Sequence, residues 1–196
     1  MSRDRRNGRI LDQEIYWAYA TIDEVLPTDV HMGMVIPALQ YQTSPEQRER
    51  WLPLATSYKI LGAYVQTELG HGSNVRALET TATFDKACLR ARATQEFVIH
   101  SPTLTSTKVK KGERRERRLI RDIYWWPGGL GKTATHCILM AQLVIEGKTL
   151  GVHPFFIQLR SLTDHKPLPG ITLGDIGPKL GFNSTDNGFC RRGELR

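Results

Sequence analysis

One stretch combines a strand-like segment with a polar, glycine-rich continuation. Residues 60–66 read as a strand and lead into Thr67-Glu68, after which Gly70 and Gly72 follow. Glycines let a backbone approach a flat ligand closely. A hydroxyl at the end of a strand, together with free amides, suits the carbonyl oxygens and ring nitrogens of a heterocycle. The same pattern is equally typical of a tight surface turn.

A second stretch places two tryptophans before small residues. Trp125 and Trp126 precede Pro127, and residues 128–132 read Gly-Gly-Leu-Gly-Lys. Paired tryptophans could form the wall of a pocket for a planar ring, although a core Trp pair beside a hairpin has the same sequence. From the residues alone, the two stretches predict no more than an aromatic cofactor pocket.

The motifs for other ligands are incomplete. A P-loop needs a glycine where Trp126 stands and a helix where the residues after Thr133 favour a strand. A dinucleotide fingerprint opening at Gly70 needs a glycine where Val75 stands. The histidines are scattered and none stands at metal-ligand spacing from another ligand, so the sequence predicts no metal site.

Length and composition indicate a small globular protein. The chain has 196 residues, of which 40% are hydrophobic, as expected for one domain or two small ones. No apolar run is long enough to span a membrane, and the arginine-rich start, residues 1–9, has no apolar core of a secretory signal. The three cysteines follow no metal or redox spacing, which is typical of free thiols in a reducing compartment.

The net charge of +7 is concentrated in four short segments. Residues 1–9, 86–92, 109–124 and 190–196 carry +3, +3, +4 and +2, so the rest of the chain carries −5. The run at 109–124 could neutralise phosphates of a nucleic acid. It has almost no interleaved aromatic residues, however, and a solvated loop is the better interpretation.

The elements that would position these residues change in type along the chain. Residues 10–26 have the periodicity of an amphipathic helix, and 29–41 predict a buried, kinked helix. Ser44, Pro45 and Gln47 form a capping box that starts a further helix ending near 51–54. Strands are predicted for residues 60–66, 80–84, 96–100, 136–145, 152–159 and 171–173. The pattern predicts an α+β protein with helices first and a small β-barrel or sandwich after them.

Longer blocks resemble one family. The text SPEQRERWLPLA (44–55), ILGAYVQTELGHGSNVRALETTATFD (60–85) and WWPGGLGKTATHCILMAQLVIEGKTLGVHPFFIQLR (125–160) is similar to the peroxisomal acyl-CoA oxidase family, within the acyl-CoA dehydrogenase superfamily. The resemblance extends over most of residues 21–189. The QTELGHG and WWPGGLGK blocks are specific to the oxidases of that superfamily.

The resemblance implies a fold and its division. Residues 1–59 would be the end of the N-terminal helical domain, and 60–189 a flavin-binding β-barrel domain of the acyl-CoA dehydrogenase type. Residues 109–124 would be a basic insertion and 190–196 an atypical tail. The C-terminal helical domains of the family are absent from this chain, which resembles a fragment. The family is homodimeric.

The resemblance also implies a chemistry. The family binds FAD non-covalently and oxidises acyl-CoA to trans-2-enoyl-CoA with O₂ as electron acceptor, forming H₂O₂ in peroxisomal β-oxidation. By the family pattern Thr67 is the flavin-contacting threonine and Gly128 the flavin-binding glycine. Their neighbours, which would shape the pocket, are Glu68, Gly70, Gly72 and Gly129.

No residue of this chain is predicted to be catalytic, because the glutamate base of the family lies in the C-terminal helical region. The chain alone is therefore expected to be inactive. The alternative is a non-catalytic isoform that binds FAD, acyl-CoA or a polyanion through its basic loop. Residues 86–92, 109–124 and 190–196 exceed the family pattern. They are either translated intron or misjoined exon, or they belong to a true splice isoform with a basic loop. The chain ends in Glu194-Leu195-Arg196 rather than in a peroxisomal Ser-Lys-Leu signal.

Overall fold

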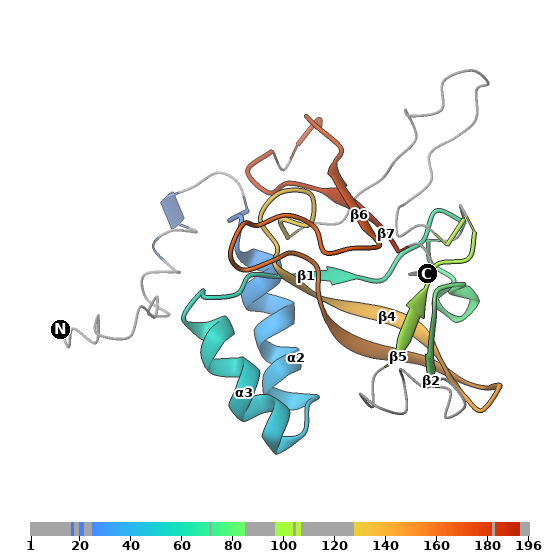
Figure 1. Cartoon of the computed structure of the whole chain (residues 1–196). Helices are drawn as coiled ribbons and strands as arrows, with labels where there is room; N and C mark the ends of the chain where they lie inside the picture. The colour runs from blue at the N-terminus through green and yellow to red at the C-terminus, as the bar shows by residue number, and fades with distance from the viewer. Residues whose placement is uncertain are drawn as a thin grey trace.

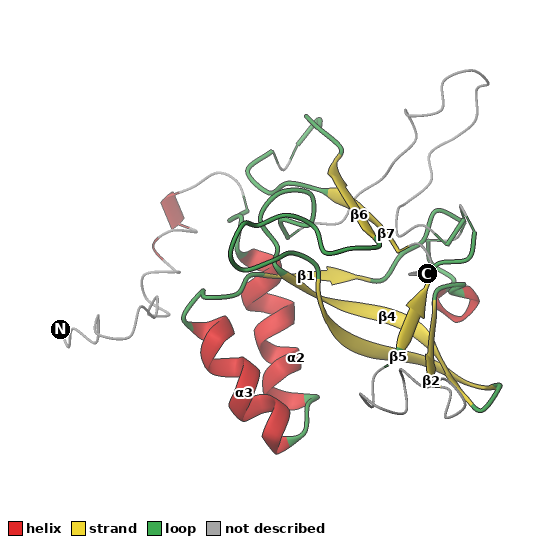
Figure 2. Ribbon diagram, viewed as in Figure 1, coloured by secondary structure: helices red, strands yellow, loops and turns green. Residues whose placement is uncertain are grey.

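The computed structural model describes residues 17, 20–21, 25–70, 72–84, 97–103, 105–106, 128–181 and 183–192. Three helical elements come first: a π-helical turn η2 (His31–Val35), α2 (Ile36–Tyr41) and α3 (Pro45–Thr56). Figures 1 and 2 show α2 and α3 packed side by side, with the strands beyond them. The helix predicted at 10–26 lies largely outside the described residues.

The helices follow the predicted spans. Residues 29–41 are helical throughout, and the π-helical turn η2 stands directly before Ile36 and Pro37, within the predicted kinked helix. The Ser44 hydroxyl accepts the Gln47 N–H at 3.3 Å, and the Ser44 N–H donates to Gln47 Oε1 at 3.1 Å. This reciprocal pair confirms the capping box. α3 continues to Thr56, slightly beyond the predicted end.

A five-stranded sheet is organised around β4 (His136–Ile145). On one side of β4, β1 (Gly62–Val65) pairs with its first half and β2 (Thr81–Phe84) with its second half, both in parallel. β3 (Val98–His100) pairs antiparallel with β2, and β5 (Lys148–Gln158) pairs antiparallel with the other side of β4. The sheet is thus mixed, which the sequence pattern did not indicate.

Tight turns and a second sheet complete the β part. Glu146 and Gly147 join β4 to β5 with φ of 50° and 76°, as a two-residue hairpin turn requires. β6 (Ile171–Asp175) pairs antiparallel with β7 (Gly188–Arg192). A 3₁₀ turn, η3, spans Val75–Ala77. β7 crosses the boundary predicted at residue 190, so the first residues of the expected tail belong to a strand.

The architecture is α+β, as predicted. The pairing among the described strands gives two separate sheets and does not close into a barrel. Within the described part of the chain, no helix is both long and apolar enough to cross a membrane.

A buried histidine joins the helices to the sheet. His31 Nδ1 accepts the Gly62 N–H and its Nε2 bonds the Ala55 carbonyl, both at 3.0 Å. Burial lowers the pKa of His31. Because the Nδ1 acceptor carries no proton, the neutral ring holds its proton on Nε2. The residue therefore fixes the start of β1 against α3.

Candidate functional site

Thr67 lies two residues after β1, half-buried. No residue in the described ranges forms a hydrogen bond with its hydroxyl. The next residue, Glu68, is completely buried, and its carboxylate accepts the N–H of Glu79 at 2.7 Å and of Thr80 at 3.0 Å. These bonds fix the turn after β1 against the beginning of β2.

Backbone and hydroxyl groups of Thr103 and Thr105 hold the remainder of that turn. The Gly70 N–H donates to the Thr105 carbonyl at 2.9 Å, and a Cβ added at Gly70 would lie 3.0 Å from Thr105 Cβ. The hydroxyls of Thr103 and Thr105 both donate to Glu79. We call residues 66–80 the carboxylate-held loop. Glu68 and Gly70 support its backbone, which their sequence pattern did not show.

Gly128 packs against the other end of β1. Its φ is +109°, a conformation that residues with a side chain rarely adopt. A Cβ at this position would lie 2.9 Å from Val30 Cγ1 and 3.5 Å from Ala63 Cα. The lack of a side chain at Gly128 therefore allows the backbone to pack closely against Val30 and Ala63 of the protein itself.

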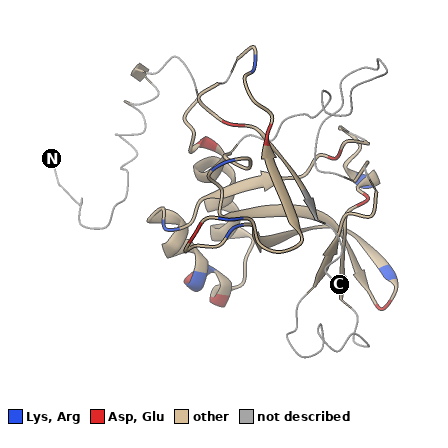
Figure 3. Ribbon diagram, turned by 45° about the horizontal axis from the view of Figure 1, so that its top comes forward, with Lys and Arg blue, Asp and Glu red and all other residues tan. Residues whose placement is uncertain are grey.

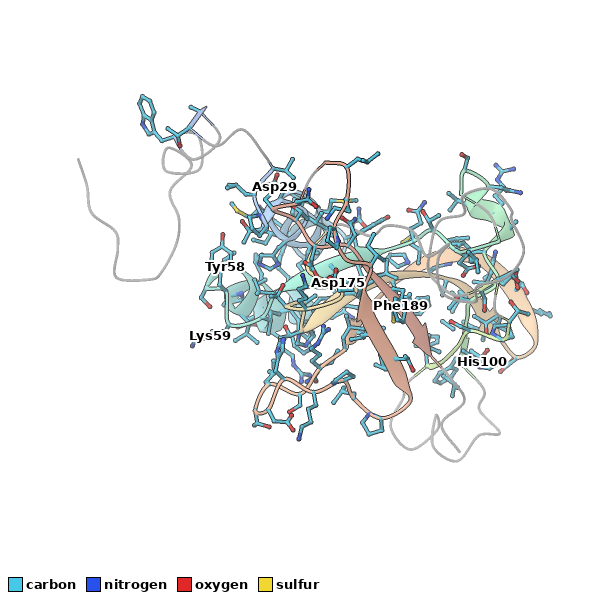
Figure 4. All side chains as sticks on the ribbon, turned by 90° about the horizontal axis from the view of Figure 1, so that it is seen from above. Asp29, Tyr58, Lys59, His100, Asp175 and Phe189 are labelled. Carbon is cyan, nitrogen blue, oxygen red and sulfur yellow. The ribbon has the colours of Figure 1, made fainter. Side chains whose placement is uncertain are left out.

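Residues 128–134, which we call the glycine loop, are fixed from the inside. The Gly129 carbonyl accepts the N–H groups of Lys132, Thr133 and Ala134 at 2.7–3.2 Å. Gly131 lies against β6, where an added Cβ would be 2.7 Å from Asp175 Cα. Figure 4 shows Asp175 and Phe189 together on β6 and β7, away from Tyr58 and Lys59 on the helical side.

The glycine loop has amides without acceptors. Gly128, Gly129 and Leu130 are buried, yet within the described ranges no acceptor is bonded to their N–H groups. Buried N–H groups are rarely left unpaired in folded proteins. A hydroxyl at Thr67 and free amides here are the donors that an acceptor-rich heterocycle needs, so the residues fit such a ligand.

Charged side chains surround the glycine loop. Lys132 Nζ is 3.1 Å from Asp175 Oδ2. Burial, together with the charge of Asp175, raises the pKa of Asp186 against the opposing charge of Lys132. Arg160 is buried beneath the loop, and burial lowers its pKa. Sequence reasoning missed both Asp186 and Arg160. The only sequence signal for Arg160 was its position directly after the apolar run that ends at residue 159.

The two predicted site residues thus stand beside the same strand. Gly128 contacts Ala63, and Thr67 follows four residues later, about 13 Å of extended chain. Gly72 is exposed in the carboxylate-held loop, and Gly129 belongs to the glycine loop. Trp125 and Trp126, the predicted ring wall, lie outside the described residues, as does the basic run 109–124.

A separate groove of about 760 Å³ lies between α2–α3 and β5. It contains neither Thr67 nor Gly128. Trp51 and Phe156 meet there edge to face, and the Arg50 guanidinium lies 4.6 Å from the Trp51 ring centre. In Figure 3 basic and acidic residues are interspersed along the described ribbon.

Comparison with known proteins identifies relatives of this chain. The model of the acyl-coenzyme A oxidase N-terminal family matches residues 2–61, which include the arginine-rich start. The chain is 51% identical over 178 residues to peroxisomal acyl-coenzyme A oxidase 1 of Arabidopsis thaliana, covering 89% of this chain and 24% of the relative. It is 44% identical over 194 residues to the Homo sapiens protein of the same name, covering 97% and 26%. Over nearly its whole length, the chain is homologous to about a quarter of these peroxisomal acyl-CoA oxidases.

Solved structures of acyl-CoA oxidases match the fold. The tomato (Lycopersicon esculentum) enzyme gives a TM-score of 0.78 at 48% identity, over 94% of this chain and 25% of that one. Acyl-CoA oxidase-2 of Caenorhabditis elegans, bound with FAD, ascaroside-CoA and ATP, gives 0.78 at 39% identity over 100% and 26%. The chain spans about a quarter of the length of these oxidases.

Proposed function

We propose that the chain forms the flavin-contacting part of an FAD-dependent acyl-CoA oxidase of peroxisomal fatty acid β-oxidation. The proposal rests above all on the 51% identity to a peroxisomal acyl-CoA oxidase across 89% of the chain. The unpaired donors beside β1 support it. Thr67 and Gly128 are the residues assigned to the flavin, and acyl-CoA and O₂ the co-substrates.

The proposed division has a helical part at 1–59, a flavin-binding barrel at 60–189 with an insertion at 109–124, and a tail at 190–196. The family model for the N-terminal part ends at residue 61, close to the first boundary. Closure of the barrel would require strands beyond those described. We also propose the homodimer that is typical of the family.

The residues of this chain would hold and orient the flavin. The Thr67 hydroxyl and the amides of the glycine loop donate hydrogen bonds, while β1 and Val30 set the distance between the two loops. When bound, FAD supplies the acceptor for the hydride that leaves the acyl β-carbon, and its electrons pass to O₂. The protein's part is to exclude water and to keep the donors fixed.

A general base is a separate requirement, since a thioester α-proton does not leave unaided. Glu68 does not meet it, because its carboxylate is buried and accepts two backbone N–H groups. We therefore propose that this chain binds FAD but does not turn over acyl-CoA by itself. Release of peroxide from acyl-CoA by the chain alone would contradict that statement.

The test is FAD retention by the full chain. The purified chain is mixed with FAD and desalted, and visible flavin absorbance is compared with protein concentration. We expect close to one flavin per chain. Thr67→Val removes the hydroxyl at nearly constant shape and is expected to weaken binding about tenfold, the value of one hydrogen bond of about 1.4 kcal/mol.

Thr149→Val is the matched control, because Thr149 is exposed on β5. It should leave FAD retention unchanged. A folded, soluble wild-type chain that retains no flavin would refute the proposed function. Equal binding by Thr67→Val and wild type would remove Thr67 from the site while leaving the function standing.

A further inference from the structure

Arg160 makes an uncommon set of contacts for a buried arginine. It is 4% exposed and follows β5. Its Nη1 donates to the carbonyls of Leu130 at 3.1 Å and Ala134 at 2.6 Å, and its Nη2 to those of Leu130 at 3.1 Å and Gly131 at 2.8 Å. Within the described ranges no carboxylate lies within ion-pair distance of it.

These contacts all fall on the glycine loop. One guanidinium holds three carbonyls that span five residues, and the rigid planar fork of arginine suits such multiple bonding. His165 Nε2 adds an outer contact, 2.8 Å from the Lys132 carbonyl. The charge of Asp186 favours the protonated guanidinium from a distance.

The carbonyl contacts also orient the amides. In a planar trans peptide the N–H points away from the preceding carbonyl. The Leu130 carbonyl is directed at Arg160, and the Gly131 nitrogen of the same peptide lies against Gly188 of β7, where an added Cβ would be 2.4 Å away. The Gly129 carbonyl is directed into the turn, so the Leu130 N–H points out of it. Arg160 fixes residues 130–134, and the N–H groups of residues 132–134 in turn hold the Gly129 carbonyl. Through this turn Arg160 acts on the direction of the unpaired Leu130 N–H.

We propose that Arg160 is a positioning residue of the flavin pocket: its guanidinium binds the carbonyls of residues 130, 131 and 134 and so holds the turn that directs the Leu130 amide toward FAD. The inference rests on the proposed function. A purely structural arginine would lower stability when replaced but would leave the affinity of the folded molecules unchanged. Preorganised donors make the affinity itself depend on Arg160.

The experiment compares Arg160→Lys with Leu39→Val in the full chain. Lysine keeps the charge but cannot bond three carbonyls as a fork. Leu39 is buried in the cluster that joins helices and sheet, so its variant lowers stability away from the loop. Thermal unfolding without FAD, quenching of flavin fluorescence on binding and the spectrum of bound flavin are recorded for each.

We expect Arg160→Lys to bind FAD at least about tenfold more weakly, with a changed flavin spectrum. Leu39→Val should bind as wild type does, even at an equal loss in melting temperature. Equal dissociation constants for the two variants, with wild type binding FAD, would overturn the role of Arg160 alone. No flavin binding by folded wild type would refute the proposed function and this inference with it.

His165→Ala is the second variant, in case Arg160→Lys does not fold. His165 is exposed, so its loss should leave the melting temperature unchanged. It removes an outer contact of the same loop, and we expect FAD binding to weaken about threefold. An unchanged dissociation constant would contradict the proposal that carbonyl contacts to the loop set the affinity.

Discussion

Two loops flank β1, and they are fixed by opposite chemistry. In the carboxylate-held loop, the buried acceptor Glu68 binds backbone N–H groups. In the glycine loop, the buried donor Arg160 binds backbone carbonyls. Among the described residues, the first arrangement pairs backbone N–H groups and leaves the Thr67 hydroxyl without a partner. The second pairs backbone carbonyls and leaves the N–H groups of Gly128, Gly129 and Leu130 without an acceptor.

The largest effect is expected from Glu68→Ala. The substitution leaves the N–H groups of Glu79 and Thr80, in a part-buried and a buried bond, without their acceptor, and we expect a loss of about 4 kcal/mol in the free energy of unfolding. For a chain of this size the melting temperature should fall by roughly 10 °C. Thermal unfolding followed by circular dichroism measures it. A loss below that of Ser44→Ala would show that the loop does not depend on its carboxylate.

We expect acid pH to lower the free energy of unfolding through His136, the first residue of β4. Burial lowers the pKa of His136 to about 4 from 6.5. The unfolded chain therefore binds the proton first, and the stability present above pH 6.5 is lost as the pH falls toward about 4. The loss amounts to about 3 kcal/mol from this residue.

Denaturant unfolding between neutral and acid pH measures that slope. His136 stacks on Phe156 with ring centres 5.2 Å apart, so His136→Gln lowers stability at neutral pH while removing the titration. We expect a flatter acid limb in this variant. An identical slope in wild type and His136→Gln would assign the acid sensitivity to other groups, of which His31 is the first candidate.

A smaller effect, about 2 kcal/mol, is expected from Gly128→Ala. The methyl group meets Val30 and must adopt a positive φ. Val30→Ala in the same chain removes the contact but not the backbone strain, so the double variant should lose less than the sum of the two single variants. Strict additivity in denaturant unfolding would show that Gly128 does not depend on Val30.

The smallest effect serves as the reference for both loops. Ser44→Ala removes the cap of α3 and should cost about 1 kcal/mol. Ser44 lies far from both loops in the sequence, and its hydrogen bonds are to Gln47. The dissociation constant for FAD should therefore stay unchanged while the melting temperature falls. A change in FAD binding would mean that the helical part and the two loops are coupled.

Local patterns predicted the elements well and their partners poorly. The capping box at Ser44 and the span of β4 could be read from neighbouring residues, because caps and strand runs depend on local chemistry. The parallel pairing of β1 and β2 with β4 could not be predicted, since it joins residues far apart in the chain. Residues 190–192 were assigned to a tail because nothing in their sequence shows that β6 lies beside them.

The candidate site divides in the same way. Thr67 and Gly128 were chosen by resemblance to a family, and their residue types fit a donor role. Composition did not show that Glu68 and Arg160 fix the two loops, because a buried charge reveals its role only through the backbone groups that surround it. The sequence by itself determined the family, the order of helices and strands, and the identity of the donor-bearing loops. Only the tertiary structure decided which backbone groups of each loop stay free, because that depends on which partner the fold buries beneath it.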